Sequence, residues 1–222
     1  MTMNLFSVFD PSTLYFLNNW ISVFLGLLFF PCLYWLVGSR LSMSGLMFIS
    51  IILKEFAPLL MKSKFVLLTV LSLFMFIMLN NSLGLFPYIF CASSHMSLTL
   101  SLALLGWLSL MVFGWLNNYN NLLVHLIPQG TPGFLMSFMV LVETVSNIIR
   151  PITLSVRLCA NMIAGHLLIT LLSSSLVSSG LMMSSLLVFG ELALMILEIA
   201  VAFIQAYVFS MLFTLYAAEL SS

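Results

Sequence analysis

The stretch ETVSNIIRPITLSVRLCANMIAGH, residues 143–166, decides how this chain can fold. It lies in a long apolar region, yet it carries a group of polar and ionisable side chains: Glu143, Asn147, Arg150, Arg157, Asn161 and His166. A charge near the middle of a bilayer costs at least ~2.5–3.5 kcal/mol on insertion scales. Residues that costly indicate, by default, an ion or proton path through the membrane.

The composition excludes a water-soluble domain. Of the 222 residues, 63% are hydrophobic and only 5% are charged, and the mean hydropathy is +1.23. A soluble domain carries roughly 25% charged residues, so we predict an all-α multi-pass membrane protein. The formal net charge is zero and the sequence has no basic run, so no nucleic-acid partner is expected. The three cysteines and three histidines show no spacing that would hold a disulfide framework, a metal or a haem, and we expect no cofactor.

The first part of the chain holds one apolar run and one amphipathic stretch. Residues 14–37 are long enough to span the membrane, with a kink at Pro31. Residues 41–64 are too broken by charges to span, so we predict a helix lying in the interface, with a plain loop as the alternative. Four of the six basic residues gather here: Arg40, Lys54, Lys62 and Lys64. By the positive-inside rule this flank faces the compartment of synthesis, and the N-terminus lies outside.

Two further membrane spans are predicted in the middle of the chain. They cover residues 65–90 and 98–116. Residues 117–133 contain NNYNN and then PQGTPG, which predict a loop. The N-terminus has neither a signal-peptide pattern nor an Arg-rich presequence, so we expect insertion where the chain is made or through an internal signal.

The last apolar runs are too long to stand upright in a bilayer. Residues 134–172 and 181–220 would form helices of about 58 and 60 Å, against an apolar core of about 30 Å. Splitting the first run at Pro151 would place two arginines in an outward loop, against the positive-inside bias. The second run has no cluster of turn residues near Gly190. We therefore predict a strongly tilted antiparallel hairpin, joined outside by residues 173–180, whose polar positions must be covered by protein or water.

Helical spacing sorts the polar residues of these two runs into stripes. Glu143, Arg150 and Arg157 are seven apart and share one face, with Asn161 near them and His166 on the opposite side. Three residues of the second run are also seven apart: Glu191, Glu198 and Gln205. An arginine of one helix could pair with an acid of the other, worth roughly 4 kcal/mol at ~4 Å and an effective dielectric of about 20.

Structural roles compete with functional ones at several of these positions. Arg150 could simply pair with Glu143, and His166 could be a satisfied core histidine. Arg157 has no acid three or four residues away, so a partner for it must come from elsewhere. Glu198 lies among apolar residues, in LMILEIAVAF, which suits a carboxyl that gains and loses protons. Glu191 is ambiguous.

Two segments carry a family resemblance. SVRLCANMIAGHLL, residues 155–168, and ILEIAVAFIQAYVF, residues 196–209, resemble the characteristic segments of the membrane-embedded a subunits of ATP synthases, above all the mitochondrial form. NNSLGLFPY, residues 80–88, and the order of elements extend the resemblance over the whole chain. The matching polar positions are Arg157, Asn161, His166, Glu198 and Gln205.

The resemblance implies a role for each matched residue. Arg157 would face a rotating ring of c subunits, each with one protonatable carboxylate, and Gln205 would lie close to it. His166 and Glu198 would belong to a half-channel open to the intermembrane space, and Glu143 to the half-channel on the matrix side. Nothing is implied for Arg150 or Glu191, which match no characteristic position of the family.

The resemblance also implies a place in a larger assembly. The chain would be the proton-conducting stator of an F-type ATP synthase, with its tilted hairpin facing the c-ring, and Arg157 would block direct leak between the half-channels. Its partners would be the c-ring, the peripheral-stalk subunit b and other small membrane subunits. It would lie in the mitochondrial inner membrane, with the N-terminus in the intermembrane space and the C-terminus in the matrix. No GxxxxGK[ST] phosphate loop is present, so nucleotide chemistry belongs to other chains.

Two other classes of protein compete with this interpretation. A secondary transporter usually shows internal repeats, and none is visible between the halves of this chain. A passive structural subunit of a respiratory complex would leave the two polar stripes unexplained. The sequence leaves open whether the ion is H⁺ or Na⁺, and in which order Glu198 and His166 would handle it.

Overall fold

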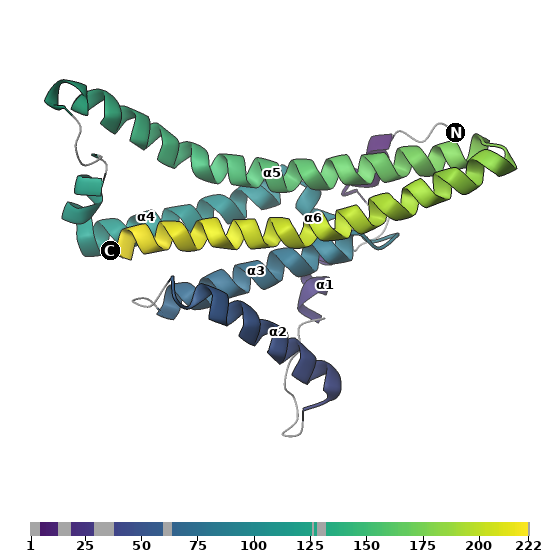
Figure 1. Ribbon diagram of the computed structural model, residues 1–222, viewed down its shortest axis with the longest axis horizontal. Coiled ribbons are helices and arrows are strands. Elements are labelled where there is room, and N and C mark those ends of the chain that lie inside the picture. The colour runs from purple at the N-terminus through teal and green to yellow at the C-terminus, as the bar shows by residue number, and fades with distance from the viewer. Residues whose placement is uncertain are drawn as a thin grey trace.

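The computed structural model describes residues 5–12, 19–28, 38–59, 64–125, 127 and 132–221. Within these ranges every regular element is a helix. Four segments are long and apolar enough to cross a bilayer: Phe65–Gly84, Met96–Asn117, Gly133–Leu176 and Met182–Ala218. The predicted all-helical class with several apolar spans is therefore confirmed (Figure 1).

The predicted first span, residues 14–37, lies partly outside the described residues, and so does its Pro31. The described N-terminal part contains two short 3-10 helices, η1 (Leu5–Phe9) and η2 (Asn19–Ile21), and the helix α1 (Ser22–Leu28). Gly26 of α1 lies against the long helix that contains Asn80, because a Cβ placed on Gly26 would be only 3.2 Å from Asn80 Oδ1. This glycine lets the two backbones approach closely.

The helix α2 (Arg40–Phe56) begins and ends at clear sequence signals. Ser39 caps its N-terminus, since its Oγ accepts a hydrogen bond of 3.3 Å from the backbone N–H of Ser42. The helix ends at Phe56, two residues before Pro58, which has no N–H to continue the helical hydrogen bonds. It is therefore shorter than the 41–64 predicted, and it crosses the other helices at an angle (Figure 1). Its position at a membrane interface stays a prediction.

The helices α3 (Lys64–Gly84) and α4 (Met96–His125) differ at their ends from the predicted spans. α3 ends at Gly84 rather than at residue 90, and a short connection containing η3 (Ala92–Ser94) follows. The loop predicted from residue 117 is wrong for residues 117–125, which are helical. Asparagine lowers helix stability by well under ~1 kcal/mol per residue, whereas proline costs about 3, so the asparagine cluster alone does not end α4.

The helices α5 (Met136–Ser178) and α6 (Leu181–Ser221) are each continuous, with 43 and 41 residues, and η4 (Gly133–Leu135) precedes α5. They would be about 64 and 62 Å long at 1.5 Å per residue. Most of the predicted connection 173–180 is helical, because only Ser179 and Gly180 separate the two helices. In Figure 1 the two run side by side in opposite directions near this connection, while the start of α5 diverges from α6.

Pro151 lies inside α5, on the α4- and α6-facing side. A proline has no N–H for the helical ladder and its ring pushes against the preceding turn, so it bends a helix. We attribute the divergence of the first part of α5 to this residue.

One apolar core joins the five longer helices from α2 to α6. Its most buried members include Phe56, Val70, Phe74, Leu110, Leu158 and Phe209. Gly106 brings α4 close to α6, because a Cβ on it would lie 2.6 Å from Phe213 Cε2. The Cys159 thiol donates a hydrogen bond of 2.8 Å to the Ser94 carbonyl, which ties α5 to the connection between α3 and α4.

Candidate functional site

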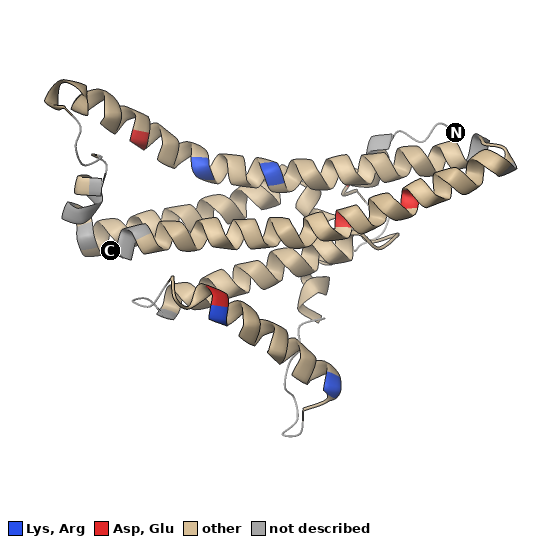
Figure 2. Ribbon diagram, in the orientation of Figure 1, with Lys and Arg blue, Asp and Glu red and all other residues tan. Residues whose placement is uncertain are grey.

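Arg150 joins the two long helices rather than pointing away from them. Its Nη2 lies 3.5 Å from Glu143 Oε1, two turns earlier in α5. Its Cζ lies 5.1 Å from the ring centroid of Tyr216 in α6, a geometry that a cation and an aromatic face favour. The structural alternative for Arg150, a pair with Glu143, is therefore confirmed. Figure 2 shows how few charged residues these two helices carry.

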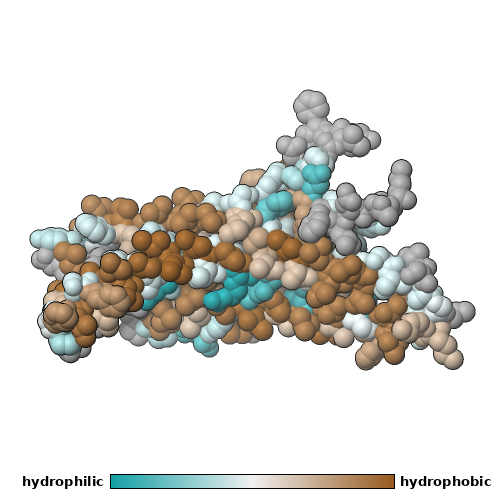
Figure 3. Space-filling model, turned by 90° about the horizontal axis from the view of Figure 1, so that it is seen from above, coloured by the Kyte–Doolittle hydropathy of each residue, from teal (hydrophilic) through white to brown (hydrophobic). Residues whose placement is uncertain are grey.

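Arg157 lies two turns further along α5 and is exposed. Its neighbours Leu158 and Cys159 are buried, so it projects from the outer side of the helix. Among the described residues no side chain forms an ion pair or hydrogen bond with it, and the possible contact with an acid of α6 is not made. Figure 3 shows a hydrophilic patch in the middle of a face that is mostly hydrophobic.

Asn161 and Gln205 are both half-buried. They lie on different helices, α5 and α6, and within the described part of the chain neither forms a hydrogen bond through its amide. Their proximity to Arg157, which the resemblance implies for Gln205, stays a prediction.

Glu198 is buried against α5, with only 4% of its surface exposed. Its carboxyl contacts Gly165, where an added Cβ would lie 2.7 Å from Glu198 Cδ. Neither carboxyl oxygen has a hydrogen-bond partner among the described residues. A buried carboxyl without a partner is costly.

His166 follows Gly165 directly and is half-buried. Its Nε2 is buried and has no hydrogen-bond partner in the described part of the chain. The ring of Phe9 in η1 meets it edge to face, with 6.4 Å between the ring centroids. The contact between Gly165 and Glu198 therefore brings the predicted pair, His166 and Glu198, to one place between α5 and α6, which spacing along either helix could not show.

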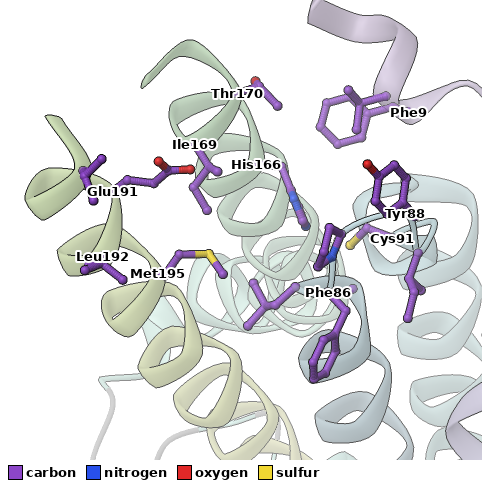
Figure 4. Close-up of a pocket in the computed structure, with 16 residues that line it drawn as sticks. Phe9, Phe86, Tyr88, Cys91, His166, Ile169, Thr170, Glu191, Leu192 and Met195 are labelled. Carbon is purple, nitrogen blue, oxygen red and sulfur yellow. The ribbon is translucent and has the colours of Figure 1, made fainter. Parts of the chain in front are cut away.

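A pocket of about 520 Å³ opens beside His166. Its walls come from η1, the connection after α3, α5 and α6 (Figure 4). Besides His166, the ionisable side chains in its lining are Tyr88, Cys91 and Glu191. Burial raises the pKa of the Cys91 thiol, and the nearby Glu198 carboxyl adds to the rise.

The sequence alone assigns no role to two residues of this pocket, Glu191 and Tyr88. For Glu191, the one indication in the sequence is its spacing of seven from Glu198. Tyr88 has a φ of 68°, in the left-handed region that few non-glycine residues adopt. Strained backbone of this kind clusters at functional sites, but nothing in the sequence indicates it. The described residues contain no group of three or more His, Cys, Asp or Glu that could hold a metal.

The fold and these side chains define a multi-pass helical membrane protein with ionisable residues between its two longest helices. The family model described as "ATP synthase A chain" matches residues 16–218. The chain is 54% identical to "ATP synthase subunit a" of Locusta migratoria over 223 residues, covering 99% of each chain. It is 52% identical to the proteins of the same name from Drosophila melanogaster and Anopheles gambiae, over 227 residues and the full length of both. The chain belongs to the ATP synthase A chain family.

Proposed function

We propose that this chain is the proton-conducting stator subunit of an F-type ATP synthase in the mitochondrial inner membrane. Two offset half-channels would deliver protons to, and remove them from, carboxylates on a ring of c subunits. The observation that carries the proposal is Arg157, an exposed cation without a partner in the described chain, on the outer side of a helix long enough to cross the membrane. A cation in that position needs an anionic partner from another chain.

The outer half-channel would begin in the pocket beside His166 and end at Glu198. The support is the contact between Glu198 and Gly165 and the unpartnered Nε2 of His166. A proton that reaches Glu198 can pass to a carboxylate of the ring. The neutral ring carboxyl then faces lipid at low cost, because burial penalises only the charged form.

Arg157 would separate the two half-channels electrostatically. Its fixed positive charge favours the ionised form of a ring carboxyl that arrives opposite it, so that carboxyl releases its proton before passing. The same charge repels a free proton moving directly from one half-channel to the other. Arginine suits this barrier because it stays protonated at any reachable pH. Each charge crossing 100 mV yields roughly 2.3 kcal/mol, so several protons are needed for each ATP.

Glu143 would line the exit on the matrix side. Its pair with Arg150, at 3.5 Å, holds the carboxylate on the side of α5 that faces Tyr216 of α6. Asn161 and Gln205 would supply neutral hydrogen-bonding groups near Arg157.

In the membrane, α5 and α6 would form a strongly tilted hairpin facing the c-ring. Helices of about 64 and 62 Å exceed an apolar core of about 30 Å, and an exposed arginine is tolerable only where protein or water covers it. The charged α2 would lie in the matrix-side interface, placing the N-terminus in the intermembrane space and the C-terminus in the matrix. Subunit b of the peripheral stalk and other small membrane subunits would hold the chain beside the ring.

Substitution of Arg157 in the assembled complex tests the proposal. Vesicles containing the complex with Arg157→Gln should neither synthesise ATP from a proton gradient nor pump protons on hydrolysis, while passive proton leak persists or rises. Arg150→Gln is the control, since it removes the other arginine of α5, and it should keep a substantial part of coupled pumping. Near-normal coupled pumping by Arg157→Gln would overturn the proposal.

A further inference from the structure

Glu191 is an ionisable residue of the pocket that the proposed function does not use. Among the described residues that line the pocket it is the one carboxylate. It lies on α6 seven residues before Glu198, about 10.5 Å along the helix axis, and so nearer the connection between α5 and α6. Figure 4 shows its carboxylate reaching from α6 toward α5, with the pocket and His166 beyond.

The surroundings of Glu191 give it no structural partner. Its helical neighbours in the pocket wall, Val188 and Leu192, are apolar. No hydrogen bond or ion pair holds its carboxylate within the described part of the chain, and it is only half-exposed. A carboxylate in an apolar wall costs free energy unless water or a cation solvates it. The pocket of about 520 Å³ has room for water, which takes ~30 Å³ per molecule in the liquid.

The ionisable groups in and next to the pocket differ in how far they are buried. Glu191 and His166 are half-buried, and Glu198 is buried against Gly165, the residue before His166. Three other titratable groups among the described residues line the pocket with Glu191. They are Tyr88 and Cys91, of the connection after α3, and His166 of α5. In the described part of the lining no lysine or arginine neutralises Glu191.

We infer that Glu191 is an additional proton-binding group, which collects protons at the mouth of the pocket and passes them inward through water toward His166 and Glu198. Its carboxylate takes a proton from a hydronium ion and releases water, then gives that proton to the next water, so each step moves one proton. A fixed negative charge in a cleft with apolar walls raises the local cation concentration and the capture rate. The inference rests on the proposed function and adds a residue to its outer half-channel.

The test is ATP synthesis by the assembled complex in vesicles, at a fixed driving force and at several values of pocket-side pH and salt. Glu191→Gln should be close to normal at acidic pH, where protons are abundant. It should fall roughly tenfold at alkaline pH and low ionic strength, where capture limits the rate. It should also lose the salt dependence that a fixed charge confers. Glu191→Asp should restore most of the rate.

Two further variants separate proton capture from packing. Thr170 lines the same pocket from α5, so adding Thr170→Glu to Glu191→Gln should restore the alkaline rate if only a carboxylate in the pocket is needed. Glu55→Gln removes an exposed carboxylate of α2 and should change nothing. Should Glu191→Gln not assemble, as a native gel would show, Glu191→Ala takes its place in the same comparison.

The outcomes distinguish this inference from the proposed function. An equal loss at every pH and salt concentration, no loss at all, or failure of both Glu191→Asp and Thr170→Glu to restore the rate would overturn the inference. If Glu198→Gln and Arg157→Gln both retained coupled transport, the proposed function itself would fall. If those two abolish transport while Glu191→Gln behaves normally, only the inference falls.

Discussion

At the scale of single residues, Gly165 decides where the Glu198 carboxyl can lie. The carboxyl occupies the space of the missing side chain on α5, directly beside His166. Contact between backbone and carboxyl is possible only because glycine has no Cβ. The absence of a side chain at Gly165 thus determines where a buried ionisable group of the neighbouring helix can lie.

Gly165→Ala should therefore displace Glu198 and reduce coupled proton transport. An added Cβ would lie 2.7 Å from Glu198 Cδ and 2.9 Å from its Cγ, so the carboxyl must move by about 1 Å. A displacement of that size can reduce the rate of a positioned reaction by about 10²-fold. The measurement is proton pumping on ATP hydrolysis by the assembled complex.

Gly190→Ala is the matched control for this prediction, because a Cβ at Gly190 meets nothing within 4 Å. That variant should pump normally, and its helix should be slightly more stable, since alanine is favoured over glycine by about 1 kcal/mol. Equal pumping by the two variants would show that the position of Glu198 is not critical.

The sequence predicts which residues belong to the candidate site, but it does not predict their contacts. The spacing of Glu143 and Arg150 along one helix predicts a shared face, and the ion pair at 3.5 Å follows from that spacing. The contact of Gly165 with Glu198 depends on the register between α5 and α6. Long-range register is set by packing over the whole interface, so no local pattern indicates it.

At the scale of helices, close packing of α4 on α6 depends on Gly106. Its Cα side faces the ring of Phe213, which belongs to the apolar core. Gly106→Ala places a Cβ 2.6 Å from Phe213 Cε2, so the ring or a helix must shift. Overpacking of this kind typically costs about 1–3 kcal/mol, and we expect a loss of that size in the free energy of unfolding, measured by denaturing-detergent titration.

The same interface offers a compensating change. Phe213→Leu shortens the side chain opposite residue 106, so the double variant should be more stable than Phe213→Leu and Gly106→Ala predict together. Gly133→Ala, where a Cβ meets nothing within 4 Å, should leave the stability nearly unchanged. Additive effects in the double variant would mean that Gly106 does not act through Phe213.

The sequence predicts the long helices better than it predicts the residues at which they end. Apolar length alone indicates the four long segments, because a span needs about 20 residues. The asparagines after residue 116 resemble a loop by composition, yet α4 continues to His125. The local cost of asparagine in a helix is well under ~1 kcal/mol per residue, so it does not stop a helix that is already formed. Proline and glycine signals, as at Pro58 and Gly84, were more reliable markers of where a helix ends.

At the scale of the whole molecule, an apolar outer surface surrounds a few polar positions. Large hydrophobic side chains are exposed along every long helix, among them Leu68, Leu105, Ile148, Phe189 and Ile204. This surface suits lipid or neighbouring subunits, whereas in water it would drive association. The helix α2 adds charges to this surface, with Lys54 and Glu55 exposed on it. We expect one orientation of the chain in the membrane, with α2 on the side where basic residues are retained.

The sidedness of three positions tests this orientation and the tilted hairpin together. In a background with the natural cysteines replaced by serine, single cysteines are placed at Ser44 in α2, at Gly133 before α5 and at Gly180 between α5 and α6. All three positions are exposed, and a Cβ at either glycine meets nothing within 4 Å. A membrane-impermeant maleimide should label Gly180→Cys from the intermembrane-space side and the other two only from the matrix side.

The basic residues of α2 and the length of α5 together give the sidedness that we expect for these positions. Basic residues of α2 should stay in the compartment of synthesis, so we expect Ser44 on the matrix side. A continuous α5 of 43 residues then crosses once, carrying the chain from Gly133 to Gly180. Labelling of Gly133→Cys and Gly180→Cys from the same side would mean that α5 crosses twice or not at all, and Arg157 would no longer lie within a single tilted span. Labelling of all three from the reverse sides would instead keep the hairpin and invert the assignment of the two half-channels.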